Sequence, residues 1–244
     1  MILRVFDDKS ALAKAAAAEA AQLIRAAIEA RGQARIVAAT GTSQYEFLEG
    51  LAAVPDIDWG RVELFHLDEY IGLPPDHPAS FHRYVCERIL ARLPIDRAWL
   101  LDGLADPQQT CKRVGMAISM VPVDVTFVGI GENGHLAFND PPADFDTDEP
   151  FLIVNLDEQG RRQQVDEGWF ATLDEVPKTA ISMSIRQILK SRAIVGVVSG
   201  ARKAEAVKLC FEGEIHPLAP ASALRLHENA TVFLDRDAGS LLPL

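Results

Sequence analysis

The stretch VDVTFVGIGENGHLAFNDPP, residues Val123–Pro142, decides the fold of this chain. It begins as an unbroken apolar run, which is typical of a strand buried on both faces of a parallel sheet. The run leads into Gly129–Gly134, whose sequence GIGENG has the GxGxxG spacing of a dinucleotide-binding turn. Such a site also needs a helix that starts at the last glycine, because the N-terminus of that helix holds the pyrophosphate. The ligand of the turn therefore depends on the residues that follow it.

The residues after this turn argue against a dinucleotide. Residues 139–142, Asn-Asp-Pro-Pro, would end a helix after barely one turn, because proline lacks the N–H that a helix needs. The turn is left crowded with Glu132, Asn133, His135 and Asp140. Among these side-chain types, only imidazole ordinarily changes charge near neutral pH, which suits it to proton transfer. His135 is therefore a candidate catalytic residue, and a hydrogen-bonded structural histidine is the alternative.

Short apolar runs alternate with helical patterns along the whole chain. Strands are expected at 34–40, 62–67, 123–130, 151–156, 180–184, 193–199 and 229–235, and helices at 11–32, 45–51, 78–93, 106–120, 185–191 and 201–213. Ser10 is expected to cap the first helix and Gly32 to end it. Near-continuously apolar strands that alternate with helices predict an α/β fold with a mostly parallel sheet between two helical layers. No linker or repeat interrupts the pattern, so residues 1–244 are expected to form one domain.

The composition excludes several classes of protein. The 244 residues carry a formal net charge of −11, so nucleic acid is not an expected partner. The three cysteines are far apart and have no CxxC spacing, which predicts free thiols and no metal site. No apolar run is long enough to cross a bilayer, and the first residues do not form a signal pattern. We therefore expect a cytoplasmic protein with no membrane partner.

The stretch ATGTSQY, Ala39–Tyr45, follows a predicted strand and offers groups that can bind an anion. Gly41 lets a ligand approach the backbone closely, and Thr42 and Ser43 add hydroxyl groups and backbone amides at the start of a helix. Helix capping is the commoner role of such residues, so the motif alone does not establish a binding site.

Asp68 and Glu69 follow directly on another apolar strand. Adjacent residues of a strand point to opposite faces, so only one of the two carboxylates can face a given ligand. One of them is a candidate base, while solvated acids at a strand end are the alternative.

Arg202 and Lys203 form a weaker signal at the start of the helix predicted at 201–213. Cations at a helix N-terminus oppose the helix dipole. A bound anion nearby would relieve this conflict, and two solvated surface cations are the alternative.

Together these motifs resemble the glucosamine-6-phosphate deaminase (isomerase) family over nearly the whole chain. That family has a TGxTP-like phosphate loop, DEYxGL with a downstream HPxSF, GIGxxGHIAFNEP and a VPKxAISM-like segment. Here these read ATGTSQY, LDEYIGL with HPASF, GIGENGHLAFNDP and VPKTAISM. The resemblance implies a modified Rossmann-like, three-layer domain. It also implies conversion of glucosamine 6-phosphate and water to fructose 6-phosphate and ammonia, without an organic cofactor.

The resemblance implies a role for each matching residue. Asp68 would move a proton between C2 and C1 of the sugar, and His135 would assist opening of its ring as an acid or base. Asp140 stands where many members have a glutamate that orients this histidine, and Asn133 stands at a position that holds Asp or Asn. Substrate and phosphate binding would fall to Gly41, Thr42, Ser43, Glu69, Gly134 and Lys203.

One departure from the family pattern concerns the phosphate. Many members carry an arginine that contacts the substrate phosphate, at the position where Gly168 or a neighbour stands here. Arg161 and Arg162 lie one or two turns upstream and are candidate substitutes. A second departure is the shorter carboxylate at Asp140, which alters how His135 would be held.

Several alternatives stay open. The substrate could be another hexosamine 6-phosphate, such as galactosamine 6-phosphate, because nothing here fixes the configuration at C4. A 6-phosphogluconolactonase shares the fold and a similar glycine turn, although LDEYIGL and AFNDP argue against it. A non-catalytic sugar-phosphate sensor is the third reading. The number of subunits is not fixed, and assembly into a homo-oligomer stays open.

The acidic segment DFDTDE, Asp144–Glu149, predicts a protein without allosteric activation. Hexameric, activated members of the family carry basic residues in this region for a second sugar phosphate, which carboxylates would repel. N-acetylglucosamine 6-phosphate is therefore expected to leave the substrate saturation curve unchanged. A clear left shift of that curve in the presence of the compound would contradict this expectation.

Overall fold

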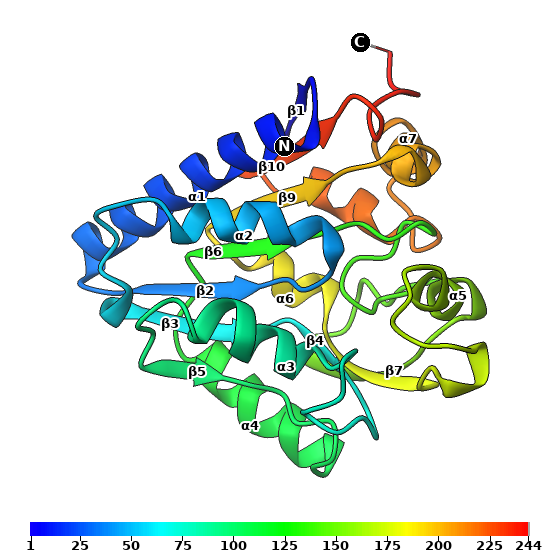
Figure 1. The fold of residues 1–244 in the computed structure, drawn as a ribbon, viewed down its shortest axis with the longest axis horizontal. Helices are drawn as coiled ribbons and strands as arrows, with labels where there is room; N and C mark the ends of the chain where they lie inside the picture. The colour runs from blue at the N-terminus through cyan, green and yellow to red at the C-terminus, as the bar shows by residue number, and fades with distance from the viewer. Residues whose placement is uncertain (244) are drawn as a thin grey trace.

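A seven-stranded parallel sheet forms the centre of the molecule (Figure 1). The computed structural model describes residues 1–243. The strand order is β1-β10-β9-β6-β2-β3-β5, and each neighbouring pair is parallel. The strands are β1 (Ile2–Phe6), β2 (Ala34–Ala38), β3 (Val62–His66), β5 (Arg97–Trp99), β6 (Val125–Val128), β9 (Ala193–Val198) and β10 (Ala230–Asp235).

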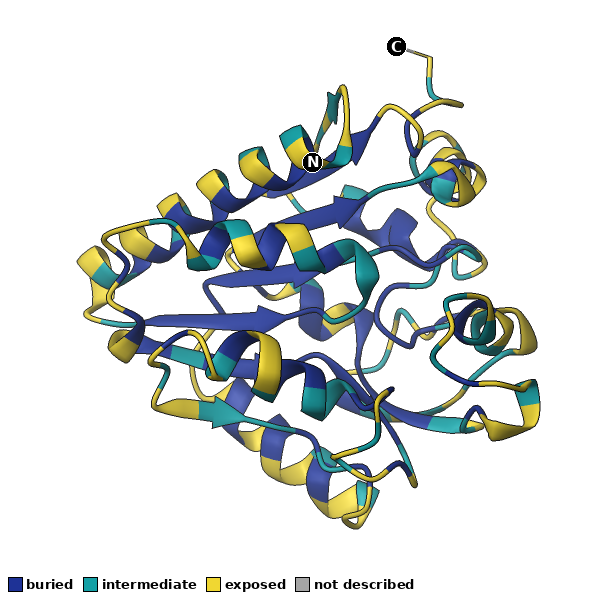
Figure 2. Cartoon of the chain, in the orientation of Figure 1, coloured by how far each residue is buried: buried dark blue, intermediate teal, exposed yellow. Residues whose placement is uncertain are grey.

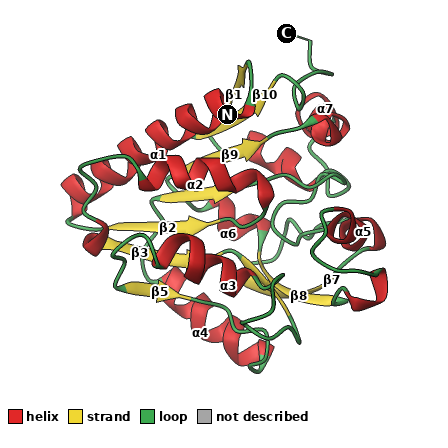
Figure 3. Cartoon of the chain, in the orientation of Figure 1, coloured by secondary structure: helices red, strands yellow, loops and turns green. Residues whose placement is uncertain are grey.

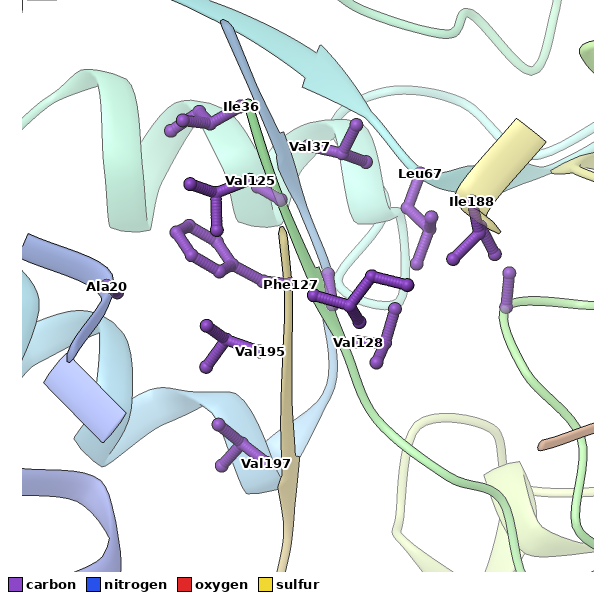
Figure 4. Packing of buried hydrophobic residues seen from close by; sticks show 14 of the residues in the cluster. Ala20, Ile36, Val37, Leu67, Val125, Phe127, Val128, Ile188, Val195 and Val197 are labelled. Carbon is purple, nitrogen blue, oxygen red and sulfur yellow. The ribbon is translucent and has the colours of Figure 1, made fainter. Parts of the chain in front are cut away.

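Helices cover both faces of this sheet and complete three layers. The helices of the molecule are α1 (Lys9–Arg31), α2 (Tyr45–Ala52), α3 (Phe81–Val85), α4 (Pro107–Ser119), α5 (Glu158–Asp166), α6 (Ile185–Leu189) and α7 (Ala204–Glu212), and α5 lies beyond the carboxyl ends of the strands (Figure 1). α1 contacts β1, β2, β6, β9 and β10 and packs beside α2, whereas α6 lies behind the sheet in Figure 1. Figure 4 shows Ile36 and Phe127 on one side of the strands, with Val128 and Ile188 on the other. The predicted α/β sandwich with a mostly parallel sheet is confirmed.

The central strands are buried from end to end. Every residue of β2, β6, β9 and β10 is buried, and these strands are dark blue in Figure 2. α1 can lie close against them because its buried stripe consists mainly of alanines, including Ala13, Ala16, Ala17 and Ala20. Among residues 1–243, no helix is both long and apolar enough to span a lipid bilayer.

A second, antiparallel sheet contains two segments that were expected in the parallel sheet. Its strand order is β4 (Asp68–Tyr70), β8 (Thr179–Met183) and β7 (Phe151–Asn155). Only Leu67 separates β3 from β4, so the chain leaves the large sheet within one residue. Burial along β7 is uneven, as expected for a strand with one solvated face, although its sequence is continuously apolar up to Asn155.

Several local expectations were wrong. The strands β1 and β5 were missed because both lie at the edges of the sheet, where exposed side chains hide the apolar pattern. α1 is capped by Asp8, whose carboxylate accepts a hydrogen bond from the Ala11 N–H, and Ser10 lies inside the helix. The helix expected at 78–93 starts only at Phe81, after Ser80 as its cap, and continues as the wider π-helical turn Cys86–Leu90.

The sheet has one edge at which functional residues can gather. β2, β3, β6 and β9 are parallel neighbours, and their arrows point the same way in Figure 3. The loops that follow them therefore meet at the carboxyl edge of the sheet, which is where open α/β sheets bind ligands.

His66, at the end of β3, predicts loss of stability in acid. Its Nδ1 atom accepts a hydrogen bond from the Leu101 N–H at 3.3 Å, and its buried Nε2 atom has no partner. Burial, aided by repulsion from His82, lowers the pKa of His66 from 6.5 to about 3. The unfolded chain therefore binds this proton more readily than the folded one. As pH falls below the unfolded pKa, this group should reduce the free energy of unfolding by about 1.4 kcal/mol per pH unit.

The variant His66→Asn keeps an acceptor for the Leu101 N–H but cannot ionise. Urea unfolding between about pH 7 and about pH 5 should give the variant a smaller loss of stability than the wild type. A constant offset from the smaller side chain does not affect this slope, and Asp68 and Glu69 titrate in both proteins. Equal pH slopes would show that His66 is not the acid-sensitive group.

Candidate active site

A pocket of about 400 Å³ lies at the carboxyl edge of the parallel sheet. Its walls come from loops that follow β2, β3, β6 and β9 and from the region of α5. The polar and charged lining residues are Lys9, Thr40, Thr42, Ser43, Asp68, His135, Gln163, Gln164, Glu167, Ser199, Arg202, Lys203 and Asp235. The separate sequence motifs thus meet around one cavity that can hold a small molecule.

His135 lines this pocket at the end of the glycine turn. Its Nδ1 atom lies 3.2 Å from Asp140 Oδ1, at an angle too poor for a good hydrogen bond. Its backbone N–H donates to Asn133 Oδ1 at 3.0 Å, which fixes the turn around it. The imidazole ring lies directly over Gly131, so a Cβ atom at that position would overlap the ring. Gly134, with φ of +83°, turns the chain but lies outside the pocket, against Cys210.

Asp140 and Asn133 lie behind His135 and do not line the pocket. Asn133 Nδ2 donates to Asp140 Oδ1 and to Asp157 Oδ2, both at 3.0 Å, and the Asp157 N–H donates to Asp140 Oδ2 at 2.9 Å. Burial opposes the charge of Asp140, but the contact with His135 and these N–H groups lower its pKa below the usual value. Asp140 is therefore a carboxylate that favours the ionised form, and it lies close enough to His135 to support the expectation that it orients the imidazole.

Asp68 and Glu69 point to opposite sides of β4, as the strand geometry predicts. Asp68 lines the pocket, is almost fully buried, and its Oδ1 atom has no hydrogen-bond partner. Burial, together with the nearby charge of Glu69, raises the pKa of Asp68 well above its ordinary value. A desolvated carboxylate in the wall of a pocket is suited to accept a proton.

Glu69 is not part of the pocket lining, contrary to the expectation that it binds substrate. Its carboxylate accepts hydrogen bonds from the Ser80 hydroxyl at 2.8 Å and from the His82 N–H at 2.6 Å, and from the N–H groups of Tyr70 and Phe81. Glu69 thereby holds the HPASF segment, residues 77–81, against β4. The sequence predicted that only one of the two acids could face a ligand, but it did not predict which one.

The loop after β2 forms another wall of the pocket. Gly41, Thr42 and Ser43 all line it, and Gly41 has a φ of +111°, which glycine adopts most readily. Below the loop, Gln44 Nε2 donates to Ser43 Oγ and to the Val197 carbonyl, both at 3.1 Å. Gln44 thus fixes the loop to β9 from beneath.

Three cations line the pocket, and the two expected substitutes for the family arginine are not among them. Arg161 donates to the backbone carbonyls of Leu173 and Val176, and Arg162 pairs with Glu158 on the exposed face of α5. That expectation was wrong because α5 turns both arginines away from the cavity. Lys9, Arg202 and Lys203 are the cations that face it.

Burial lowers the pKa of Lys203, while the carboxylates of Glu167 and Glu132 act in the opposite direction. Glu167 itself accepts hydrogen bonds from Gln163 Nε2 at 2.7 Å and from Trp169 Nε1 at 3.3 Å. Gln163 on α5 and Glu167 at its C-cap were not among the site residues predicted from the sequence. The available signal was the four-residue spacing of Gln163 and Glu167, which puts both on one helix face.

Comparison with known proteins agrees with this geometry. A family model described as glucosamine-6-phosphate isomerases/6-phosphogluconolactonase matches residues 7–233. The chain belongs to this family. It is 37% identical over 243 residues to the glucosamine-6-phosphate deaminase of Bacillus pumilus, covering 97% of this chain and 98% of that protein. It is 38% identical over 207 residues to the deaminase of Lactobacillus delbrueckii, covering 84% of this chain and 86% of that protein.

Solved structures place the chain in the same family. A structure described as a monomeric glucosamine-6-phosphate deaminase has a TM-score of 0.91 and 33% identity, and covers 99% of this chain and 100% of that one. A 6-phosphogluconolactonase from Shewanella baltica has a TM-score of 0.77 and 22% identity, with 96% and 97% coverage, and so shows the shared fold alone. The resemblance inferred from the motifs is confirmed.

The network behind His135 predicts a pH-dependent effect of Asn133→Asp. The change replaces the donor Nδ2 by an oxygen that faces the carboxylates of Asp140 and Asp157, both now 3.0 Å from that nitrogen. Three carboxylates so close should destabilise the fold by about 2 kcal/mol or more at neutral pH. Crowding raises the pKa of the new group, so lowering the pH should protonate it and restore much of the stability.

Urea unfolding at about pH 7.5 and about pH 5 measures this effect. The control is Asn155→Asp, which adds the same charge at an exposed position on β7. A loss of stability at Asn133 that is equal at both pH values, or equal to the control, would show that the network does not depend on the amide donor.

Proposed function

We propose that this protein converts glucosamine 6-phosphate and water to fructose 6-phosphate and ammonia. The observation that carries this proposal is the pocket, whose lining includes the buried carboxylate of Asp68, the imidazole of His135 and Lys203. The two deaminase relatives, which align over most of the chain, support the same reaction.

Ring opening of the sugar is assigned to His135. The step removes a proton from the anomeric hydroxyl and returns one to the ring oxygen, and a neutral imidazole can carry it. Asp140, held ionised by its N–H donors, supports the imidazole while it carries the extra proton. Gly131 gives the ring its place against the backbone.

Isomerisation is assigned to Asp68. Its carboxylate takes the proton from C2 of the open-chain sugar and delivers it to C1, which leaves an imine at C2. Water then adds to C2 and ammonia leaves, which forms the ketone of fructose 6-phosphate. Burial makes this carboxylate a stronger base than a solvated aspartate, because desolvation disfavours the charge it gives up. β4 is hydrogen-bonded to β8, so the base sits on a rigid element.

The phosphate end of the substrate is assigned to Lys203 and the loop Gly41–Ser43. These groups line the same pocket. Residues 1–243 contain no cluster of three or more His, Cys, Asp or Glu side chains that could hold a metal ion. Binding energy from a remote phosphate can orient the reacting end of a sugar.

The decisive test combines substrate choice with Asp68→Asn. Purified protein should release ammonia and fructose 6-phosphate from glucosamine 6-phosphate, and Asp68→Asn should lower kcat by about 10²–10⁴-fold. Asp148→Asn, whose parent side chain is 81% exposed and pairs with Arg186, is the matched control and should keep full activity.

Other outcomes identify other functions. Turnover of galactosamine 6-phosphate in preference to the gluco form would change the substrate but keep the mechanism. Hydrolysis of 6-phosphogluconolactone alone would replace the proposal by a lactonase. Binding of the sugar phosphate without turnover would indicate a sensor.

A further inference from the structure

We propose that Arg202 is a second phosphate-binding cation, which Glu132 holds beside the pocket and which transfers to the phosphate when a sugar phosphate binds. The inference rests on the proposed function for the identity of the substrate. It concerns any phosphate monoester in this pocket, however, and can be tested without turnover.

Arg202 is placed by a fixed loop between β9 and α7. The Asp235 carboxylate accepts hydrogen bonds from the Gly200 N–H, with both oxygens at 3.0 Å, and from the Ala238 N–H at 2.8 Å. The Lys203 N–H donates to the Gly200 carbonyl at 3.0 Å and closes the turn. The Asp235 carboxylate therefore binds backbone N–H groups and fixes the loop. Both cations of this loop line the pocket.

The charge of Lys203 alone is poorly matched to a phosphate dianion. Glu167 is the carboxylate that acts most strongly on Lys203, and Gln163 and Trp169 hold it in the pocket wall. Lys9, the third cation of the lining, pairs with Glu46 at 3.3 Å. Lys203 is opposed by Glu167 and Arg202 by Glu132, so the positive charge that this end of the pocket can offer a phosphate depends on moving Arg202 away from Glu132.

Arg202 pairs with Glu132 through one of its nitrogen atoms. Its Nε atom lies 3.3 Å from Glu132 Oε1, and the arginine side chain is 59% exposed. Glu132 is only 22% exposed, so solvent screens the arginine more than the carboxylate of this ion pair. A phosphate offers the planar guanidinium two parallel, charge-assisted hydrogen bonds, which are stronger.

Glu132 can release Arg202 without disturbing the catalytic turn. Its backbone N–H donates to Gln163 Oε1 at 3.1 Å, so the main chain is held independently of the side chain. Glu132 Oε1 is buried and has no hydrogen bond of good geometry, so moving Arg202 to a phosphate leaves this oxygen without its charged partner. The carboxylate thus positions the arginine and sets the electrostatic cost of moving it.

Calorimetric titration with fructose 6-phosphate and with inorganic phosphate tests the proposal. Arg202→Gln should raise Kd by about 10- to 100-fold, the loss of one charge-assisted contact. Glu132→Gln should lower Kd by about 2- to 5-fold, and this gain should vanish when Arg202→Gln is also present. Arg162→Gln, which removes an equal charge from the outer face of α5, should leave Kd unchanged.

Turnover provides an independent measurement. With glucosamine 6-phosphate, Arg202→Gln should lower kcat/KM by about 10- to 100-fold with most of the change in KM, as expected for a group that binds ground and transition states alike. Arg202→Lys should recover part of this loss, because a lysine restores the charge but not the paired hydrogen bonds.

The failure of this inference can be told from the failure of the proposed function. Wild-type Kd for both phosphate ligands in Arg202→Gln, or equal effects of Arg202→Gln and Arg162→Gln, would overturn the role of Arg202 even if the wild type deaminates its substrate. A wild type that binds fructose 6-phosphate through Arg202 but turns over no hexosamine phosphate would overturn the proposed function and leave the arginine in place.

Discussion

The hydrogen bonds between Asn133, Asp140 and Asp157 are the constraint on which the site depends. Asp157 is the N-cap of α5, so the same amide that supports the His135 turn also fixes where α5 begins. α5 then brings Gln163 and Glu167 to the pocket wall. His135 and the α5 wall of the pocket are therefore positioned by one small polar network, which is paired through the Asn133 amide.

Most of the fold could be predicted from the pattern of strands and turns in the sequence. β6 and its glycine turn could be predicted because a strand covered on both faces must be apolar throughout, and because the prolines at 141 and 142 exclude a long helix. The second sheet could not be predicted. The chain leaves the large sheet at Leu67, and pairing of β4 with β8 depends on residues more than a hundred positions away.

The candidate site residues could be predicted where they lie near the carboxyl end of a strand. Asp68 follows β3 after one intervening residue and His135 lies in the turn after β6, so their place at the carboxyl edge follows from topology. The orientation of residues on α5 did not follow, because it depends on how the helix is rotated about its axis. Arg161 and Gln164 differ by three positions, yet the first binds backbone carbonyls outside the pocket and the second lines it.

The middle glycine of the GxGxxG stretch has an unexpected reason to be glycine. Gly131 has no positive φ, so its backbone would accept other residues. The obstacle is the imidazole of His135, which occupies the space of a Cβ atom. In a dinucleotide site the corresponding space admits a pyrophosphate, whereas here the protein fills it with its own aromatic ring. The spacing thus reflects the space that His135 needs rather than the identity of a ligand, and a larger residue at position 131 would displace the imidazole.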